Sequence, residues 1–250
     1  MLPEIDLGPL DLKTFGICFA LGFLAAGAVI ARRLRELGES PDWAYEMVFA
    51  ALIGGLVGSR LDYILQNWDD VSGDLLGNIF SGSGLVWQGG ALGGAIGVLL
   101  WARWRNWLNL TLLDTCAVPL ALGYAIGRIG CQLSGDGDYG VASDLPWAMA
   151  YPDGVVPTTD EVHPTPVYET LAMGLVALVL WRLRDRVAPG VVFGLYLVAA
   201  GTERLLVEFI RRNDSVVVGL TLAQLVSVAM LAAGAALLFA LRDRLRPATT

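Results

Sequence analysis

The sequence is poor in lysine and histidine. It holds one of each, Lys13 and His163, so arginine carries nearly all of its positive charge. Acidic residues outnumber basic ones, and the net charge is −7. A protein that binds nucleic acid needs a clustered basic face, so we expect no nucleic-acid partner. The arginines instead offer planar groups that suit phosphate and carboxylate.

Cysteine is also scarce. Cys18, Cys116 and Cys131 lie far apart and form no CxxC pair, which argues against a zinc site or a disulfide framework. The stretch DGDYG (136–140) has the acidic start of a calcium loop but lacks the glutamate of its twelfth position. Its glycines equally fit a plain turn. We therefore predict no metal and no cofactor.

Charged residues make up only 16% of the chain, whereas hydrophobic residues make up 55% and the mean hydropathy is +0.59. This composition predicts an all-α integral membrane protein, organised as a single transmembrane domain over residues 1–250. A helix needs about 20 apolar residues to cross a bilayer. About seven transmembrane helices are expected, over residues 14–31, 45–65, 83–102, 109–130, 166–183, 190–210 and 217–241.

The segments between these spans alternate in charge. The basic segments are 32–38, 102–105, 182–186 and 242–246, and the acidic ones are 66–74 and 131–165. The positive-inside rule then places the N-terminus outside and the C-terminus in the cytoplasm. Arg211 and Arg212 fall on the outer side against this rule, which suggests a local task. The long, proline-containing segment 131–165 is expected to form a small external loop subdomain or lid.

Ionisable residues inside membrane spans are costly and usually functional. Here the polar residues gather near the outer ends of the spans: Arg60, Asp62, Gln88, Arg128, Tyr168, Glu169, Arg204 and Glu208. Several arginines at the outer leaflet suggest a phospholipid phosphate, which arginine binds with paired hydrogen bonds. The alternative is that Arg204–Glu208 and Arg60–Asp62 are self-satisfied pairs, or that the arginines snorkel.

Glycines recur four residues apart inside the predicted spans. The pairs are Gly54 and Gly58, Gly90 and Gly94, Gly93 and Gly97, and Gly123 and Gly127. This spacing lets two helices approach closely. Plain helix packing is the favoured interpretation, and a groove with room for a lipid is the alternative.

Four stretches of the chain carry a resemblance. They are WQGGALGGAIG (87–97), GRIGCQLSGDGDYG (127–140), HPTPVYE (163–169) and GTERLLVEFIRRND (201–214). In this order they resemble the motifs of the prolipoprotein diacylglyceryl transferases: His-Gly-Gly-Leu-x-Gly, Gly-Arg-aliphatic-Gly-Asn running into an acidic residue and an aromatic-Gly, His-Pro-Ser-Gln-Leu-Tyr-Glu, and Arg-Phe-x-x-Glu-Phe-x-Arg. That family moves diacylglyceryl from phosphatidylglycerol to the thiol of a lipobox cysteine on a prolipoprotein and releases glycerol phosphate.

The resemblance implies a multi-pass protein of the bacterial inner membrane whose active site faces the outer side. Arg128 and Arg204 would bind the phosphate, and Glu208 would orient Arg204 or meet the glycerol. Together, the residue pattern and the resemblance give as catalytic candidates Arg128, Arg204, Glu208, Asp136 and His163. The candidates for substrate or lipid binding are Arg60, Gln88, Gly89, Gly90, Gly130, Asp138, Tyr139, Tyr168 and Glu169. If a base is needed to ionise the thiol, the candidates are His163, Asp136 and Asp138.

The chain departs from the family at Phe15, Gln88, Cys131 and Ala200, where the family often has tyrosine, histidine, asparagine and tyrosine. Gln88 cannot act as a general base. These departures motivate a second hypothesis, a non-catalytic or different-acceptor relative that binds anionic phospholipid. A small-solute transporter is disfavoured, because we find no paired inverted halves with broken helices.

Overall fold

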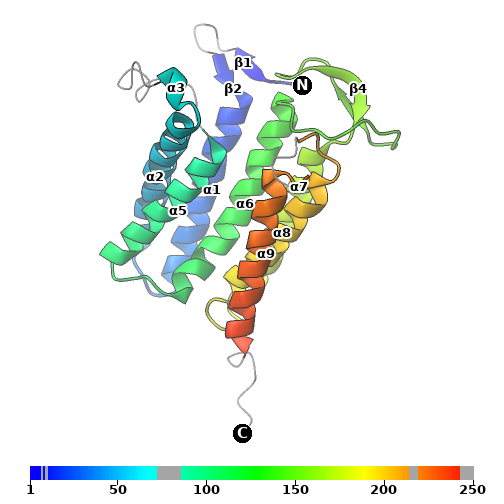
Figure 1. The fold of residues 1–250 in the computed structure, drawn as a ribbon. Coiled ribbons are helices and arrows are strands. Elements are labelled where there is room, and N and C mark those ends of the chain that lie inside the picture. The colour runs from blue at the N-terminus through cyan, green and yellow to red at the C-terminus, as the bar shows by residue number, and fades with distance from the viewer. Residues whose placement is uncertain (7, 9–10, 72–85, 214–218, 243–250) are drawn as a thin grey trace. The chain divides into compact units, whose positions relative to one another are not determined.

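The protein is described by a computed structural model, which covers residues 1–6, 8, 11–71, 86–213 and 219–242. Long helices dominate these ranges (Figure 1). Those of 18 residues or more are α1 (Thr14–Glu36), α2 (Trp43–Gln66), α5 (Trp87–Trp104), α6 (Leu110–Ser134), α7 (Thr165–Leu183), α8 (Val191–Glu208) and α9 (Leu222–Ala240). Each predicted span therefore contains a helix, although residues 83–85 and 217–218 of two spans lie outside the described residues.

Five of these helices are long and apolar enough to cross a membrane, judged by length and composition over the described residues: α1, α2, α6, α7 and α9. The other two, α5 and α8, have 18 residues each. The 18 residues of α8 include Glu203, Arg204 and Glu208, and those of α5 include Gln88 and Arg103. The predicted count of seven spans therefore stays a prediction.

The all-α expectation holds for the long elements, but short elements accompany them. Helix α3 (Trp68–Val71) follows α2. Strand β1 (Glu4–Asp6) pairs antiparallel with β2 (Asp11–Lys13), and β3 (Met149–Tyr151) pairs antiparallel with β4 (Thr158–Val162). The chain groups into two compact units, residues 30–112 and residues 1–29 with 113–250.

Helices α2 and α5 of the first unit pack through their glycines. A Cβ added at Gly54 would overlap the carbonyl oxygen of Gly93, and one added at Gly58 would overlap that of Gly89. The reverse additions meet the same obstacle, and a Cβ at Gly97 would overlap the carbonyl oxygen of Ala50. Close approach of two backbones without side chains between them is what this spacing predicts. The packing interpretation is confirmed for these glycines.

Replacing Gly93 with alanine should therefore lower the melting temperature of the purified protein. The new methyl group has to push α2 and α5 apart, and overpacking of this kind costs about 1–3 kcal/mol. Tryptophan fluorescence during heating in detergent measures the effect. Gly174→Ala in α7 is the matched control, because a Cβ there meets no atom within 4 Å in the described part of the chain. Equal melting temperatures for the two variants would contradict this account of the packing.

The second unit has its core between α6, α7 and α8. Small and aliphatic side chains dominate its buried cluster, which includes Ala117, Ala121, Ala125, Met173, Ala177, Leu180, Val192 and Ala200. Asp114 on α6 accepts hydrogen bonds from the backbone N–H groups of Gly190 at 2.7 Å and Phe193 at 2.8 Å. These contacts cap the start of α8 and tie it to α6.

Two glycines of α6 behave differently from each other. A Cβ at Gly123 would lie 3.9 Å from the carbonyl oxygen of Gly22 on α1, which indicates close helix packing. A Cβ at Gly127 would meet no atom of the described residues within 4 Å, so the expectation that Gly127 completes a packing pair is wrong.

Residues between α6 and α7 form a small folded region. Its core is made by Tyr139, Tyr151 and Val162, with the two tyrosine rings stacked at a centroid distance of 4.8 Å. Residues 131–134 belong to α6, so this region is shorter than the predicted 131–165. The N-terminal segment lies against the same end of α6, because the backbone N–H of Leu2 donates to the carbonyl of Leu133 at 2.8 Å.

Candidate functional site

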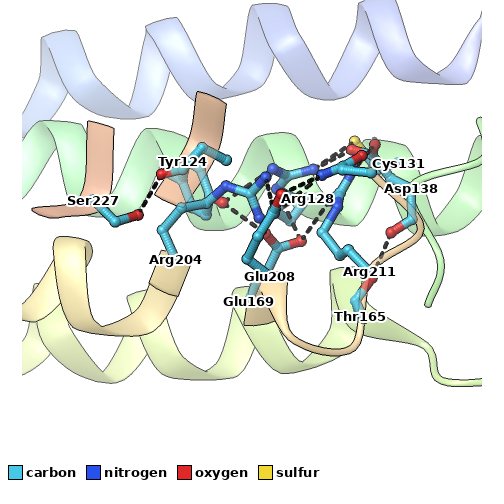
Figure 2. Close-up of polar contacts among 12 residues, drawn as sticks. Tyr124, Arg128, Cys131, Asp138, Thr165, Glu169, Arg204, Glu208, Arg211 and Ser227 are labelled. Carbon is cyan, nitrogen blue, oxygen red and sulfur yellow. Dashed lines mark hydrogen bonds and ion pairs between the residues drawn. The ribbon is translucent and has the colours of Figure 1, made fainter. Parts of the chain in front are cut away.

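Charged side chains from α6, α7, α8 and the segments that follow α6 and α8 form one connected cluster inside the second unit (Figure 2). We call it the ion network, and it consists of Arg128, Arg204, Arg211, Asp138, Glu169 and Glu208. All six were noted from the sequence, but only the structure joins them. The network has equal numbers of arginines and carboxylates, which is how so many charges remain buried together.

Glu169, near the start of α7, is the centre of the ion network. Its side chain has no exposed surface. Its Oε2 atom lies 3.1 Å from Nε of Arg128 and 3.7 Å from Nη1 of Arg211, and its Oε1 atom lies 3.9 Å from Nη1 of Arg204. The hydroxyl of Tyr124 donates to Oε1 at 2.7 Å and accepts from Nη2 of Arg128 at 3.0 Å. One carboxylate therefore orients three guanidinium groups.

Asp138 closes the other side of the network. One of its oxygens pairs with Arg128 and the other with Arg211. The turn that presents it needs glycine, because Gly135 and Gly137 have positive φ values of 59° and 94°. Gly135 also ends α6, donating its N–H to the carbonyl of Cys131 at 2.9 Å. The Gly-Asp-Gly-Asp stretch thus places a carboxylate back over Arg128.

The two aspartates of this turn have opposite electrostatic surroundings. Burial raises the pKa of Asp136 above its ordinary value, and the charge of Asp138 raises it further. Burial also acts to raise the pKa of Asp138, but Arg128 and Arg211 outweigh it, so the net pKa is lowered. Asp138 is therefore an anion held by arginines, while Asp136 holds a proton more readily.

Arg204 and Glu208 form the pair that their spacing predicts, with Nη2 and Oε2 2.7 Å apart. Glu208 also accepts from the side chains of Asn213, at 2.9 and 3.0 Å, and Thr221, at 2.5 Å. The pair is thus self-satisfied on the glutamate side. The arginine side is different, because Nη1 of Arg204 is buried without a hydrogen-bond partner among the described residues.

Arg211 has the same kind of unused donor. Its side chain is only 9% exposed, and its Nη1 atom has no hydrogen-bond partner in the described part of the chain. Buried donors are normally hydrogen-bonded, so unused ones call for a partner. These two guanidinium nitrogens lie 3.9 and 3.7 Å from oxygens of Glu169 without a hydrogen bond to them, so both can donate to the oxygens of an anionic ligand.

The Sγ atom of Cys131 lies 3.8 Å from Nη1 of Arg128. Cys131, Asp136 and Asp138 also bring their ligand atoms within 4.8 Å of one another, as a metal site would require. Both oxygens of Asp138 are already engaged by arginines, whose charge repels a cation. The group of Cys131, Asp136 and Asp138 is therefore better suited to pairing with arginine than to binding a metal ion.

Several predicted site residues lie outside the ion network. The hydroxyl of Tyr168 accepts from Nε1 of Trp147 at 2.8 Å and lies 3.4 Å from Nδ1 of His163. Tyr139 is in the core of the region between α6 and α7, and the guanidinium of Arg212 lies 4.7 Å from its ring centroid. A Cβ at Gly130 would lie 2.9 Å from Cβ of Cys18, which indicates close packing of α6 on α1.

The predicted candidates of the other unit form contacts of their own. The guanidinium of Arg60, a buried residue, lies 5.2 Å from the ring centroid of Tyr63. Asp62 accepts from the N–H of Gly89 at 2.9 Å, so it caps the start of α5. Gly89 and Gly90 face α2, and Gln88 is the second residue of the same helix, α5. The structure gives the two glycines a packing role.

Sequence reasoning missed two residues next to the ion network, Tyr124 and Glu203. Tyr124 precedes Arg128 by four residues, so the two share a face of α6. Glu203 is an ionisable residue inside an apolar helix, which is the signal that identified its neighbour Arg204. Helix spacing could have identified Tyr124, and the search for ionisable residues inside apolar helices could have identified Glu203.

The fold and the ion network together define a helical membrane protein with a buried arginine–carboxylate site. The family model "Prolipoprotein diacylglyceryl transferase" matches residues 4–240, and the chain belongs to this family. Similar proteins are named phosphatidylglycerol–prolipoprotein diacylglyceryl transferase. The one from Clostridium tetani is 33% identical, and the match covers 82% of this chain and 83% of the relative. The one from Chromohalobacter salexigens is 35% identical, and the match covers 94% of this chain and 92% of the relative. One from Leptospira interrogans is 30% identical, and the match covers 82% of this chain and 73% of the relative.

Proposed function

We propose that this chain is an enzyme that transfers the diacylglyceryl group of phosphatidylglycerol to the cysteine thiol of a prolipoprotein lipobox. Glycerol phosphate is released. Relatives with this name match most of the chain, and the observation that carries the proposal is the pair of unused guanidinium donors on Arg204 and Arg211. They lie beside Arg128, so the site offers guanidinium hydrogen-bond donors of the kind that a phosphodiester accepts.

The reaction displaces a phosphate from a glycerol carbon. The acceptor sulfur forms a bond to that carbon while the bond from carbon to phosphate oxygen breaks, so negative charge grows on the departing phosphate. Guanidinium groups that are already in place stabilise this charge without reorganisation. Arg128, Arg204 and Arg211 have this role in the proposal, and Glu169 holds all three in position.

We further propose seven spans in the bacterial inner membrane, with the N-terminus and the ion network at the outer side and the C-terminus in the cytoplasm. The distribution of charged residues along α7, in the second unit, supports this orientation. The ion network lies at the end of α6 and the start of α7, whereas Arg182, Arg184 and Arg186 cluster around the opposite end of α7. Large apolar side chains on the helices, such as Leu24, Leu171 and Leu206, are exposed, as a lipid-facing surface requires.

The test is a direct assay of the product. Purified protein in detergent is mixed with phosphatidylglycerol and a synthetic lipobox peptide, and mass spectrometry looks for a peptide that carries a diacylglyceryl thioether. The expected result is this thioether together with glycerol phosphate. Phosphatidylglycerol that binds without any product would instead support the non-catalytic or different-acceptor relative.

A further inference from the structure

Transfer releases a proton from the acceptor thiol, and the inference that follows rests on the proposed function. A thiol becomes a strong nucleophile only when it loses this proton, so a nearby base accelerates the step. The carboxylates of the ion network are poorly suited to this task. Asp138, Glu169 and Glu208 each form an ion pair with at least one arginine, which stabilises the carboxylate and weakens it as a base, although Oε2 of Glu169 has no hydrogen-bond partner among the described residues.

Glu203 is a fourth carboxylate beside the network, and its position differs. Its Oε1 atom is buried and has no hydrogen-bond partner among the residues that the structure describes. It nevertheless interacts electrostatically with Glu169, Arg128, Arg204 and Arg211. Glu203 is therefore close enough to the ion network to interact with it electrostatically, while its Oε1 atom has no hydrogen-bond partner among the described residues.

The placement of Glu203 relative to the arginines also matters. In the close-up, Arg204 and Asp138 lie at opposite ends of the ion network (Figure 2). Glu203 precedes Arg204 on α8, and side chains on a helix lean toward its N-terminus. Glu203 therefore lies on the part of α8 that carries Arg204.

Displacement at carbon requires the nucleophile to approach from the side opposite the leaving group. The arginines of the ion network hold the departing phosphate in the proposed reaction, so the acceptor sulfur approaches the glycerol carbon from the side away from them. A base for the thiol must lie near the network and keep an oxygen free to accept the proton. Glu203 meets this condition through its Oε1 atom, whereas an oxygen of Asp136 already accepts a hydrogen bond from the N–H of Asp138 at 3.3 Å.

We propose that Glu203 is the catalytic base that takes the proton from the lipobox cysteine. As the proton moves to the Glu203 carboxylate, the sulfur bonds to the glycerol carbon and the bond from carbon to phosphate oxygen breaks. The electron pair leaves with the phosphate, which the arginines hold. The proton then passes from Glu203 to the released glycerol phosphate or to water, which restores the carboxylate.

Other charged or titratable groups face Glu203 and act on its protonation. They are Tyr124 and Arg128 of α6, Glu169 of α7, Tyr196 and Arg204 of α8, and Arg211 beyond α8. The described part of α9 contributes none. A Glu203→Gln change leaves all of these groups in place, so it isolates the role of one carboxylate.

The experiment measures transfer by Glu203→Gln with phosphatidylglycerol and two lipobox peptides, one with cysteine and one with selenocysteine. With cysteine, kcat should fall by about 100- to 10,000-fold, which is the usual contribution of a general base. The selenol is ionised at neutral pH and needs no base, so the variant should come within about tenfold of the wild-type rate with that peptide. Binding of phosphatidylglycerol should stay at the wild-type level.

Two further variants complete the test. Glu203→Asp keeps a shorter base and should retain more cysteine activity than Glu203→Gln. Glu161→Gln, at an exposed glutamate of β4, is the matched control and should keep the full rate. A wild-type rate for Glu203→Gln would overturn the assignment, as would an equal loss with both peptides. Wild-type protein that makes no product with either peptide would overturn the proposed function, and this assignment with it.

Discussion

Replacing Arg128 with alanine should lower kcat/KM for diacylglyceryl transfer by at least about 1,000-fold. Loss of a single preorganised donor to a developing anion typically costs about 100- to 1,000-fold. Arg128 is more than one donor, because it contacts Asp138, Glu169 and Tyr124 at once and brings a full positive charge. The rate of thioether formation with phosphatidylglycerol and a lipobox peptide measures the effect.

Two companion variants separate charge from geometry at this position. Arg128→Lys keeps the charge but lacks the planar fork, so it should recover only part of the lost rate. Arg35→Ala removes an exposed arginine of α1 and should leave the rate unchanged. If Arg128→Ala supports transfer at the wild-type rate, the ion network is not the phosphate site.

Glu169→Gln should have the second largest effect, on stability as well as on activity. Glu169 is fully buried and faces three arginines, so the neutral amide leaves positive charges uncompensated in the interior. Removing one partner of a buried ion pair costs about 3–5 kcal/mol. We expect a lower melting temperature in detergent and a loss of transfer of at least about 100-fold, because the arginines are no longer held in place.

Glu161→Gln on β4 is the control here too, since it makes the same chemical change at an exposed site. Anionic lipid provides a second check. Phosphatidylglycerol supplies a negative charge to the arginines, so it should raise the melting temperature of Glu169→Gln more than that of the wild type. A Glu169→Gln protein as stable and as active as the wild type would show that the arginines do not depend on this carboxylate.

The residues that depart from the family motifs occupy different kinds of position. Ala200 lies in the helical core of the second unit. Phe15 packs against α6, because a Cβ added at Gly130 would lie 3.4 Å from its Cα atom. Cys131 is the departure that touches the ion network, through Arg128. Gln88 belongs to the unit of residues 30–112.

Local pattern was enough to predict the helices and the turn. Continuous apolar runs located every long helix to within a few residues, because membrane-length hydrophobicity and helix formation are properties of a single segment. The same holds for Gly135 and Gly137, whose positive φ values follow from the local chemistry of the turn. Pairs within one helix, such as Arg204 and Glu208, follow from spacing alone.

By itself, then, the sequence determined the helical class, the family resemblance and the set of charged residues near the ends of the helices. Only the tertiary structure decided which charges meet. Arg128, Glu169 and Arg211 lie about 40 residues apart along the chain, and their contact depends on how α6, α7 and α8 pack. The structure also showed that the buried Oε1 atom of Glu203 has no hydrogen-bond partner among the described residues, which depends on the groups packed around it.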